Sequence, residues 1–184
     1  MAFIVGLFVV VAGYFLVEWW LNREVASAIE VSNENGSTGT ALVVYHPGRG
    51  GFGRKTRGAF VASLEANGWR VETSTASAQA PSNLAAYDLL VLSGPIYGFA
   101  PSRPLRSYLR RLGDLHGKPT VAILTGMGAG ERADSIIKTD VQRANGELVA
   151  SLLLYSMKPN EDLYGTNDPV EIATQAAKAV SPPQ

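Results

Sequence analysis

The stretch YDLLVLSGPIYGF, residues 87–99, joins an apolar run to a glycine-rich turn that carries aromatic side chains. The continuous apolar first half is typical of a strand that is buried on both faces. The glycines that follow let the backbone approach a ligand closely, and the aromatic rings offer flat apolar surfaces. The stretch therefore predicts a strand that ends at a binding site for a planar ligand.

Strands and helices alternate on both sides of this stretch. The sequence predicts further strands at 41–45, 69–74, 119–126 and 148–157, and helices at 57–68, 103–113, 133–146 and 168–180. Strands that alternate with helices pair in parallel through right-handed crossovers. We therefore expect an α/β domain over residues 41–181, built on a doubly wound sheet of five parallel strands. Ligands of such domains bind at the carboxyl ends of the strands.

Residues 45–56, YHPGRGGFGRKT, follow one of these strands and satisfy more than one nucleotide-binding pattern. A P-loop needs a lysine directly after its second glycine, and Arg54 stands in that place. The dinucleotide fingerprint turns the chain at the strand end, whereas His46 and Pro47 intervene here. The third interpretation is a phosphate cradle of backbone amides and a helix N-terminus, helped by Arg49. The glycines alone leave all three interpretations open.

Three segments together resemble the flavodoxin family and its quinone-reductase relatives. They are ALVVYHPG (41–48), YDLLVLSGPIYGFAPSRPLRSYL (87–109) and GKPTVAILTGMGAGE (117–131), in the same order along the chain. The resemblance extends over nearly all of residues 41–180. It implies a flavodoxin-like fold that binds FMN noncovalently and passes on electrons or hydride. It also implies that the protein needs no catalytic acid or base, because the flavin carries the chemistry.

The resemblance further implies which residues would bind FMN. Residues 46–56 would cradle the phosphate, the loop from Pro95 to Phe99 would lie on one ring face with Tyr97 stacked on it, and residues 125–130 would follow the other edge of the ring. The expected cofactor-binding residues are Gly48, Arg49, Gly50, Gly51, Phe52, Gly53, Arg54, Pro95, Ile96, Tyr97, Gly98, Phe99, Thr125 and Gly126.

The phosphate loop departs from the family pattern. Flavodoxins usually present Ser and Thr hydroxyls there, whereas this chain has glycines together with Arg49, Arg54 and Lys55. Backbone amides, a helix N-terminus and arginines can still hold an anion. The departure leaves an alternative open, in which a flavodoxin-like domain with a degenerate pocket acts as a non-enzymatic binding module.

Residues 2–21 form an apolar run that is predicted to be a single transmembrane helix. About 20 residues at about 1.5 Å each cover a hydrocarbon core of about 30 Å. A cleaved signal peptide is the rival interpretation, because residues 26–28, ASA, resemble a cleavage site, but no Lys or Arg precedes the run. Residues 22–40 gather Ser, Asn, Gly and Thr and are predicted to be a linker. Arg23 and later basic residues follow the run, which favours a cytoplasmic domain.

Composition narrows the range of functions. The 16 basic and 16 acidic residues cancel, so no global field indicates a nucleic-acid partner. The chain has no cysteine and only two histidines, His46 and His116, so the sequence predicts no Cys- or His-based metal site. Between residues 45 and 111, however, nine basic residues accompany three acidic ones. This local excess predicts attraction to an anionic leaflet or to an acidic partner protein.

Taken together, these patterns predict a single-pass, membrane-anchored protein with a flavodoxin-like domain. We expect an FMN-dependent oxidoreductase or electron-transfer protein that acts near the membrane. The expected partners are the lipid bilayer, contacted through residues 2–21, and a quinone or a membrane redox protein.

Overall fold

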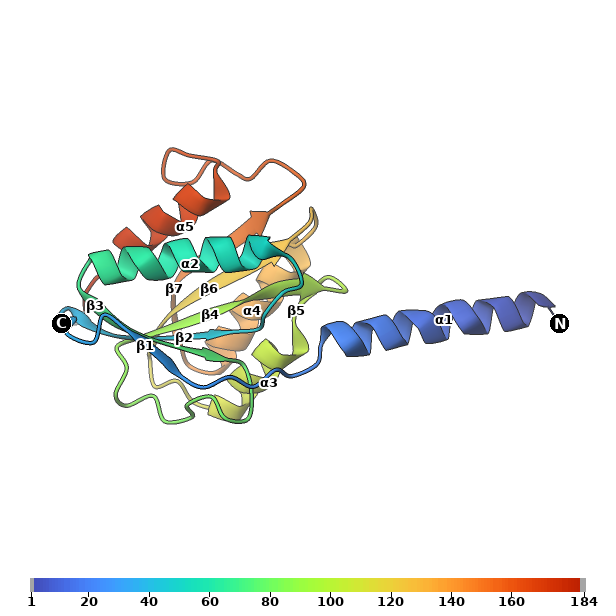
Figure 1. Cartoon of the computed structure of the whole chain (residues 1–184), viewed down its shortest axis with the longest axis horizontal. Coiled ribbons are helices and arrows are strands. Elements are labelled where there is room, and N and C mark those ends of the chain that lie inside the picture. Colours follow the sequence, from blue (N-terminus) through green and yellow to red (C-terminus); the bar gives the residue numbers. More distant parts are fainter. Residues whose placement is uncertain (1, 183–184) are drawn as a thin grey trace.

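One sheet organises the domain (Figure 1). A computed structural model describes the backbone of residues 2–182 and the side chains of residues 10–182. The helices are α1 (Ala2–Leu21), α2 (Gly51–Ala66), α3 (Arg103–Leu112), α4 (Glu131–Arg143) and α5 (Pro169–Lys178). The strands are β1 (Glu30–Ser32), β2 (Gly39–Tyr45), β3 (Trp69–Thr75), β4 (Leu89–Tyr97), β5 (Ala100–Pro101), β6 (Pro119–Gly126) and β7 (Glu147–Tyr155).

The strand order is β1-β3-β2-β4-β6-β7, with β5 paired to β4 outside this path. Strands β3, β2, β4, β6 and β7 run parallel, so the five predicted parallel strands are confirmed. The sheet as a whole is larger than predicted, because β1 adds an antiparallel edge strand beside β3 and β5 folds back on β4. The order of the parallel strands reverses between β2 and β4, which is where ligands of doubly wound sheets bind.

Two helices cover each face of the sheet, and each pair closes one half of the core. On one face, α2 and α5 bury Phe60, Leu64 and Ile172 against the strands (Figure 1). On the other face, α3 and α4 bury Tyr108 and Ile137. Each large apolar side chain that is fully buried contributes about 1.5–3 kcal/mol. Burial on both faces explains why the central strands are continuous apolar runs in the sequence.

The segment predicted as a linker, residues 22–40, is in large part built into the domain. Residues 30–32 form β1, and Asn33 donates a side-chain hydrogen bond to the carbonyl of Trp69 at 2.8 Å. At Gly36 a Cβ atom would lie 2.5 Å from the backbone nitrogen of Arg70. The linker interpretation is therefore wrong for this part, because its short polar residues form an edge strand and a tight turn rather than a free chain.

Helix α1 projects from the end of the domain at which the parallel strands terminate (Figure 1). Its described apolar side chains are largely exposed, with Phe15 at 61%, Leu16 at 65% and Trp19 at 63%. In the part of the chain whose side chains are described, no helix is long and apolar enough to cross a membrane. The side chains of residues 2–9, which belong to the predicted anchor, lie outside the described residues.

Candidate functional site

The three predicted segments meet at the carboxyl edge of the sheet. A Cβ atom added to Gly48, after β2, would lie 3.7 Å from the side chain of Pro95 in β4. A Cβ atom added to Gly53, in the first turn of α2, would lie 3.1 Å from the hydroxyl of Thr125 in β6. The structure therefore brings residues predicted from distant parts of the chain into one place.

Helix α2 begins earlier than the sequence predicts. The prediction placed residues 46–56 in a loop and began the helix at residue 57, but α2 starts at Gly51, with Gly50 as an extended N-cap that has no capping side chain. Glycine lowers helix propensity by about 1 kcal/mol per residue, which hid the helix in the sequence. The first amides of α2 have no intrahelical acceptor, and they carry the positive end of the helix dipole.

Three arginines surround a cavity of about 260 Å³ at the start of α2. Its lining consists of Tyr45, Pro47, Gly48, Arg49, Gly50, Gly51, Arg54 and Arg57. These residues include three guanidinium groups and no carboxylate, so the cavity is complementary to an anion.

Arg57 belongs to this cavity although the sequence did not single it out as a site residue. Its guanidinium carbon lies 3.7 Å from the centre of the Tyr45 ring. Burial lowers the pKa of Arg57, and the charge of Arg54 lowers it further. Residues three apart on a helix share a face, but the predicted helix began at residue 57 and left Arg54 in the loop, so this signal did not indicate Arg57.

The segment predicted as a loop, residues 95–99, is partly a strand. Pro95, Ile96 and Tyr97 extend β4, and Tyr97 pairs with Ala100 across a two-residue turn. Both residues of this turn have positive φ, 54° at Gly98 and 61° at Phe99, as in a tight type I′ hairpin. A phenylalanine in this conformation is strained, and such strain is concentrated at functional sites.

Ile96 and Tyr97 link this hairpin to the other parts of the site. A Cβ atom on Gly126 would lie 3.2 Å from the Cδ1 atom of Ile96, so the hairpin packs on the end of β6. The partly buried Tyr97 ring meets His46 edge to face, with 6.3 Å between the ring centres. Phe99, by contrast, is 60% exposed and points its ring outward.

His46 is the most unusual buried group at this edge. It is 3% exposed, and burial lowers its pKa, so the imidazole is neutral near pH 7. Its Nε2 atom lies 3.1 Å from the carbonyl oxygen of Arg23, whereas Nδ1 has no hydrogen-bond partner among the described residues. The buried hydroxyl of Ser102 also lacks a partner among these residues, and a Cβ on Gly94 would lie 3.2 Å from that hydroxyl oxygen and 3.7 Å from the Cβ atom of His46. Unpaired buried polar groups cost about 1–3 kcal/mol each, and they call for a functional explanation.

The segment that follows α1 forms part of the site. Asn22 accepts a hydrogen bond from the backbone of Arg103 at 2.8 Å, and the backbone amide and hydroxyl of Ser27 bond to Thr75. A second cavity of about 290 Å³ lies under this segment, lined by Leu21, Arg23, Val25, His46, Pro47, Gly48 and Arg49. The sequence did not predict that residues 22–28 lie across the ends of the strands.

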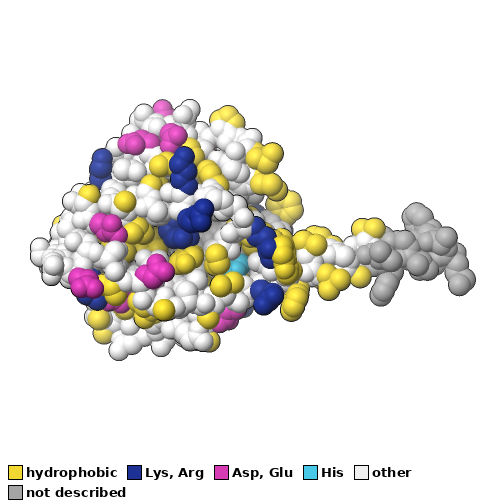
Figure 2. Space-filling view, viewed as in Figure 1, with side chains coloured by type: hydrophobic (Ala, Val, Ile, Leu, Met, Phe, Trp, Pro, Cys, Tyr) yellow, Lys and Arg dark blue, Asp and Glu magenta, His cyan; other side chains and the backbone are white. Residues whose placement is uncertain are grey.

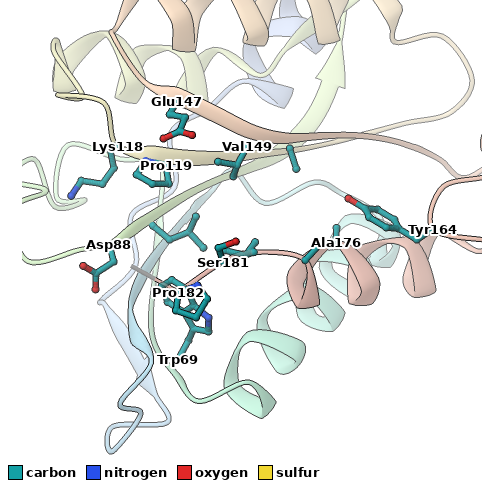
Figure 3. A pocket seen from close by; sticks show the side chains of 14 residues that line it. Trp69, Asp88, Lys118, Pro119, Glu147, Val149, Tyr164, Ala176, Ser181 and Pro182 are labelled. Atoms are coloured by element: carbon teal, nitrogen blue, oxygen red, sulfur yellow. The ribbon is translucent and has the colours of Figure 1, made fainter. Parts of the chain in front are cut away.

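A larger cavity of about 660 Å³ lies at the opposite end of the sheet (Figure 3). Trp69, Val149 and Pro182 form apolar walls, while Asp88 and Lys118 lie at one end. Asp88 accepts a hydrogen bond from the backbone of Thr40, and Lys118 donates one to the carbonyl of Tyr87. These charged groups are therefore engaged by the fold, and the cavity lies away from the strand ends at which ligands bind in doubly wound sheets.

No protein-family model and no curated protein matches the sequence. Solved structures match its fold. Oxidised Flavodoxin 2 from Bacillus cereus aligns with a TM-score of 0.62 and 22% identity, covering 76% of this chain and 96% of that one. The two-electron reduced flavodoxin of Megasphaera elsdenii gives 0.60 and 18%, covering 76% and 99%. An NAD(P)H:quinone oxidoreductase from Methanothermobacter marburgensis gives 0.50 and 14%, covering 77% and 94%. The chain therefore has the flavodoxin-like fold that the sequence predicts.

The start of α2 fits the phosphate of FMN, the cofactor that this fold implies. The arginine-lined cavity and the amides of α2 suit a phosphate, and the backbone approaches closely at Gly48 and Gly53. Tyr97 offers an aromatic face beside the unpaired Nδ1 atom of His46. The two cavities of about 260 and 290 Å³ are each slightly below the range of about 300–1,000 Å³ that is usual for small-molecule sites.

Proposed function

We propose that this protein binds FMN at the carboxyl edge of its sheet and uses it for electron transfer or reduction next to a membrane. The observation that carries the proposal is the cavity formed by Arg49, Arg54 and Arg57 at the start of α2. It lies beside β2, at the switch in strand order where ligands of doubly wound sheets bind.

Arginine replaces hydroxyl side chains in the proposed phosphate site. Guanidinium groups form charge-assisted hydrogen bonds to phosphate oxygens, about twice as strong as neutral ones. The amides of Gly51, Phe52 and Gly53 lie at the start of α2 and would add backbone donors and the helix dipole. In this way the site would bind the anion without the Ser and Thr hydroxyls usual in flavodoxins.

The ring of the flavin would lie between the β4–β5 hairpin and the end of β6. Tyr97 would stack on one face, while Thr125 and Gly126 would follow the other edge of the ring. The segment 22–28, which lies over His46, would help to exclude water from this region. Bound FMN would supply hydride or single-electron transfer, so the protein needs no catalytic acid or base of its own.

The membrane position rests on residues 2–21. A helix of 20 residues matches the thickness of a hydrocarbon core, and the exposed apolar side chains described in its second half would be covered by lipid. Arg23 lies directly after the helix, which favours a cytoplasmic domain. A quinone or a membrane redox protein is the partner that this position would bring within reach of the flavin.

A non-enzymatic binding module for a phosphate-bearing ligand is the second candidate. The lining of the two cavities favours it, because neither is lined by residues 95–99 or 125–130, which would hold the ring. On this alternative the arginines would bind a phosphate group, and no flavin would be retained.

Replacing Tyr97 with Ala tests the ring site. We expect the full chain to bind FMN. We expect Y97A to weaken that binding or to shift the flavin absorption spectrum, because the stacking of the tyrosine ring on the flavin ring is lost. The matched control is Y164A, since Tyr164 is exposed and lies away from this edge. A Y97A protein that binds FMN like the Y164A protein, with an unchanged spectrum, would remove Tyr97 from the site. A chain that ignores FMN but still binds inorganic phosphate would favour the binding module.

A further inference from the structure

Three loop tips at the carboxyl end of the domain expose large apolar side chains. Phe99 is 60% exposed, Met127 is 70% exposed and Met157 is 77% exposed. Single exposed apolar residues are common on protein surfaces and need no explanation. Here, however, the three follow β4, β6 and β7, which are parallel neighbours in the sheet, so all three lie at the same end.

Backbone contacts join these tips into one surface. The amide of Met157 donates to the carbonyl of Met127 at 3.1 Å, so the loops after β6 and β7 lie side by side. The β4–β5 hairpin packs on the end of β6 through Ile96, which lies within contact distance of Gly126. The tips of the three loops therefore lie near one another at this end, and we call their exposed side chains the apolar rim (Phe99, Met127 and Met157).

The apolar rim lies next to the C-terminal turns of α1. A Cβ atom on Gly98 would lie 3.2 Å from the carboxylate of Glu18 and 3.6 Å from the hydroxyl of Tyr14. Asn22, just after α1, is bonded to the backbone of Arg103. In the space-filling view, hydrophobic and basic side chains gather on the domain where it meets α1 (Figure 2). The exposed side of α1 and the apolar rim thus share one end of the molecule.

Basic side chains accompany the apolar rim. Arg23 lies over the Trp19 ring, with 5.9 Å between its guanidinium carbon and the ring centre, and Arg49 lies over the Trp20 ring. Arg103 is exposed, and its backbone amide is hydrogen-bonded to Asn22, the neighbour of Arg23 in the chain. None of the ion pairs found among residues 10–182 involves these three arginines.

The nearby acidic groups are engaged in other contacts. Glu18 accepts a hydrogen bond from the Asn22 side chain at 3.1 Å, and Glu24 accepts one from the amide of Ala78. Glu131 is paired with Lys158. Hydrogen bonds from neutral amide groups leave the charges of Glu18 and Glu24 in place, so the positive excess beside α1 is that of Arg23, Arg49 and Arg103 over these two carboxylates.

We propose that the apolar rim, together with Arg23 and Arg103, rests on the surface of an anionic lipid bilayer. The inference deepens the proposed function and rests on its membrane tether. Apolar side chains flanked by arginines suit the boundary between headgroups and acyl chains, and electrostatic attraction to anionic lipids reaches only about 8 Å at physiological salt. A bilayer is favoured over a protein partner because this surface adjoins α1, whose described apolar side chains are largely exposed.

This arrangement would set the orientation of the whole domain. The carboxyl edge, with the proposed flavin site, would face the headgroups, and the cavity at the amino ends of the strands would face away. A lipid-soluble electron acceptor would then reach the hairpin of residues 97–100 without leaving the membrane surface.

Single-cysteine labelling tests the proposal directly, because the chain has no cysteine. Met127→Cys and Met157→Cys would each carry a nitroxide spin label in the full chain, reconstituted in phosphatidylcholine vesicles with or without phosphatidylserine. Ser82→Cys is the matched control, since Ser82 is exposed near the amino end of β6. Flotation of the vesicles reports separately whether the chain is bound to the membrane.

We expect the labels at 127 and 157 to collide several-fold more with lipid-dissolved oxygen, and less with an aqueous nickel complex, than the label at 82. The difference should grow with phosphatidylserine and shrink in the R23Q/R103Q double variant. A chain that floats while all three labels stay aqueous would overturn the inference and leave the tether standing. Labels shielded from both oxygen and nickel would overturn it in favour of a protein contact. A chain that does not float would refute the tether and the inference together.

Discussion

Arg57→Gln removes one of the three guanidinium groups around the cavity at the start of α2. Arg57 is partly buried, lies 3.7 Å from the Tyr45 ring and takes part in none of the ion pairs among the described side chains. Burial is the main cause that lowers the pKa of Arg57, and Arg54 adds to it, while Tyr45 and Glu30 act in the opposite direction. An anion that enters the cavity would therefore stabilise the charged form of Arg57.

The expected loss of affinity follows from the kind of bond that is removed. A hydrogen bond to a charged group contributes about 1.5–3 kcal/mol, and about 1.4 kcal/mol corresponds to a tenfold change in affinity. We expect R57Q to weaken FMN binding by about 10- to 150-fold. Riboflavin has the same ring but no phosphate, so its affinity should not change.

The stability of the ligand-free protein should change little. The variant loses the contact between Arg57 and Tyr45, and such contacts are worth about 0.5–1 kcal/mol when exposed and about 2 kcal/mol when desolvated. It also relieves the repulsion between Arg57 and Arg54. These effects oppose each other, so the free energy of unfolding should stay within about 1 kcal/mol of the parent.

Fluorescence titration of the full chain in detergent, with FMN and with riboflavin, measures the effect. Lys55→Gln is the control, because Lys55 lies on the same helix, is exposed and does not line the cavity. An equal loss of affinity for FMN and riboflavin in R57Q would refute the assignment of the cavity to the phosphate. So would an effect of K55Q as large as that of R57Q.

Three further changes test the fold and its electrostatics. The backbone amides of Glu131 and Gly130, above all, lower the pKa of Glu131 from 4.5 to about 2. The carboxylate of Glu131 therefore stabilises the folded state fully above about pH 4.5, and this stabilisation is lost as the pH falls toward 2. In E131Q, the free energy of unfolding in urea should depend less on pH between these values. Asp168 accepts two backbone hydrogen bonds at the start of α5, and D168A should cost about 1 kcal/mol in urea unfolding. At Gly36 a Cβ would press on the backbone of Arg70, so G36A should cost about 1–3 kcal/mol, measured in the same way. If E131Q shows the same loss of stability at low pH as the parent, its contacts do not stabilise the fold. If D168A or G36A unfolds at the same urea concentration as the parent, the cap or the close approach at Gly36 does not matter for stability.

The parallel strands were predictable because strands that are buried on both faces are continuous apolar runs in the sequence. Leu89, Leu90, Val91 and Leu92 are all fully buried and adjacent in the chain, as expected for a strand covered on both sides. The short strands β1 and β5 have no such apolar run. They have three and two residues, and their pairing depends on residues distant in sequence, such as the contact of Val31 with Glu72.

The candidate site was predictable in outline and not in detail. Strand ends rich in glycine indicated where a ligand binds, and the structure brings those ends together. The start of α2 was misplaced because glycines mask a helix, and Arg57 was missed as a consequence. The contact of His46 with the carbonyl of Arg23 joins residues 23 positions apart, and no local pattern predicts such a contact.

FMN binding by the full chain tests the central proposal most directly. The measurement is a titration of the detergent-solubilised protein with FMN, followed by flavin fluorescence and by the absorption spectrum of the protein after gel filtration. We predict one FMN per chain and a dissociation constant at or below about 1 μM, which corresponds to about −8 kcal/mol. A colourless protein whose addition leaves the flavin signal unchanged at micromolar concentrations would contradict the redox function.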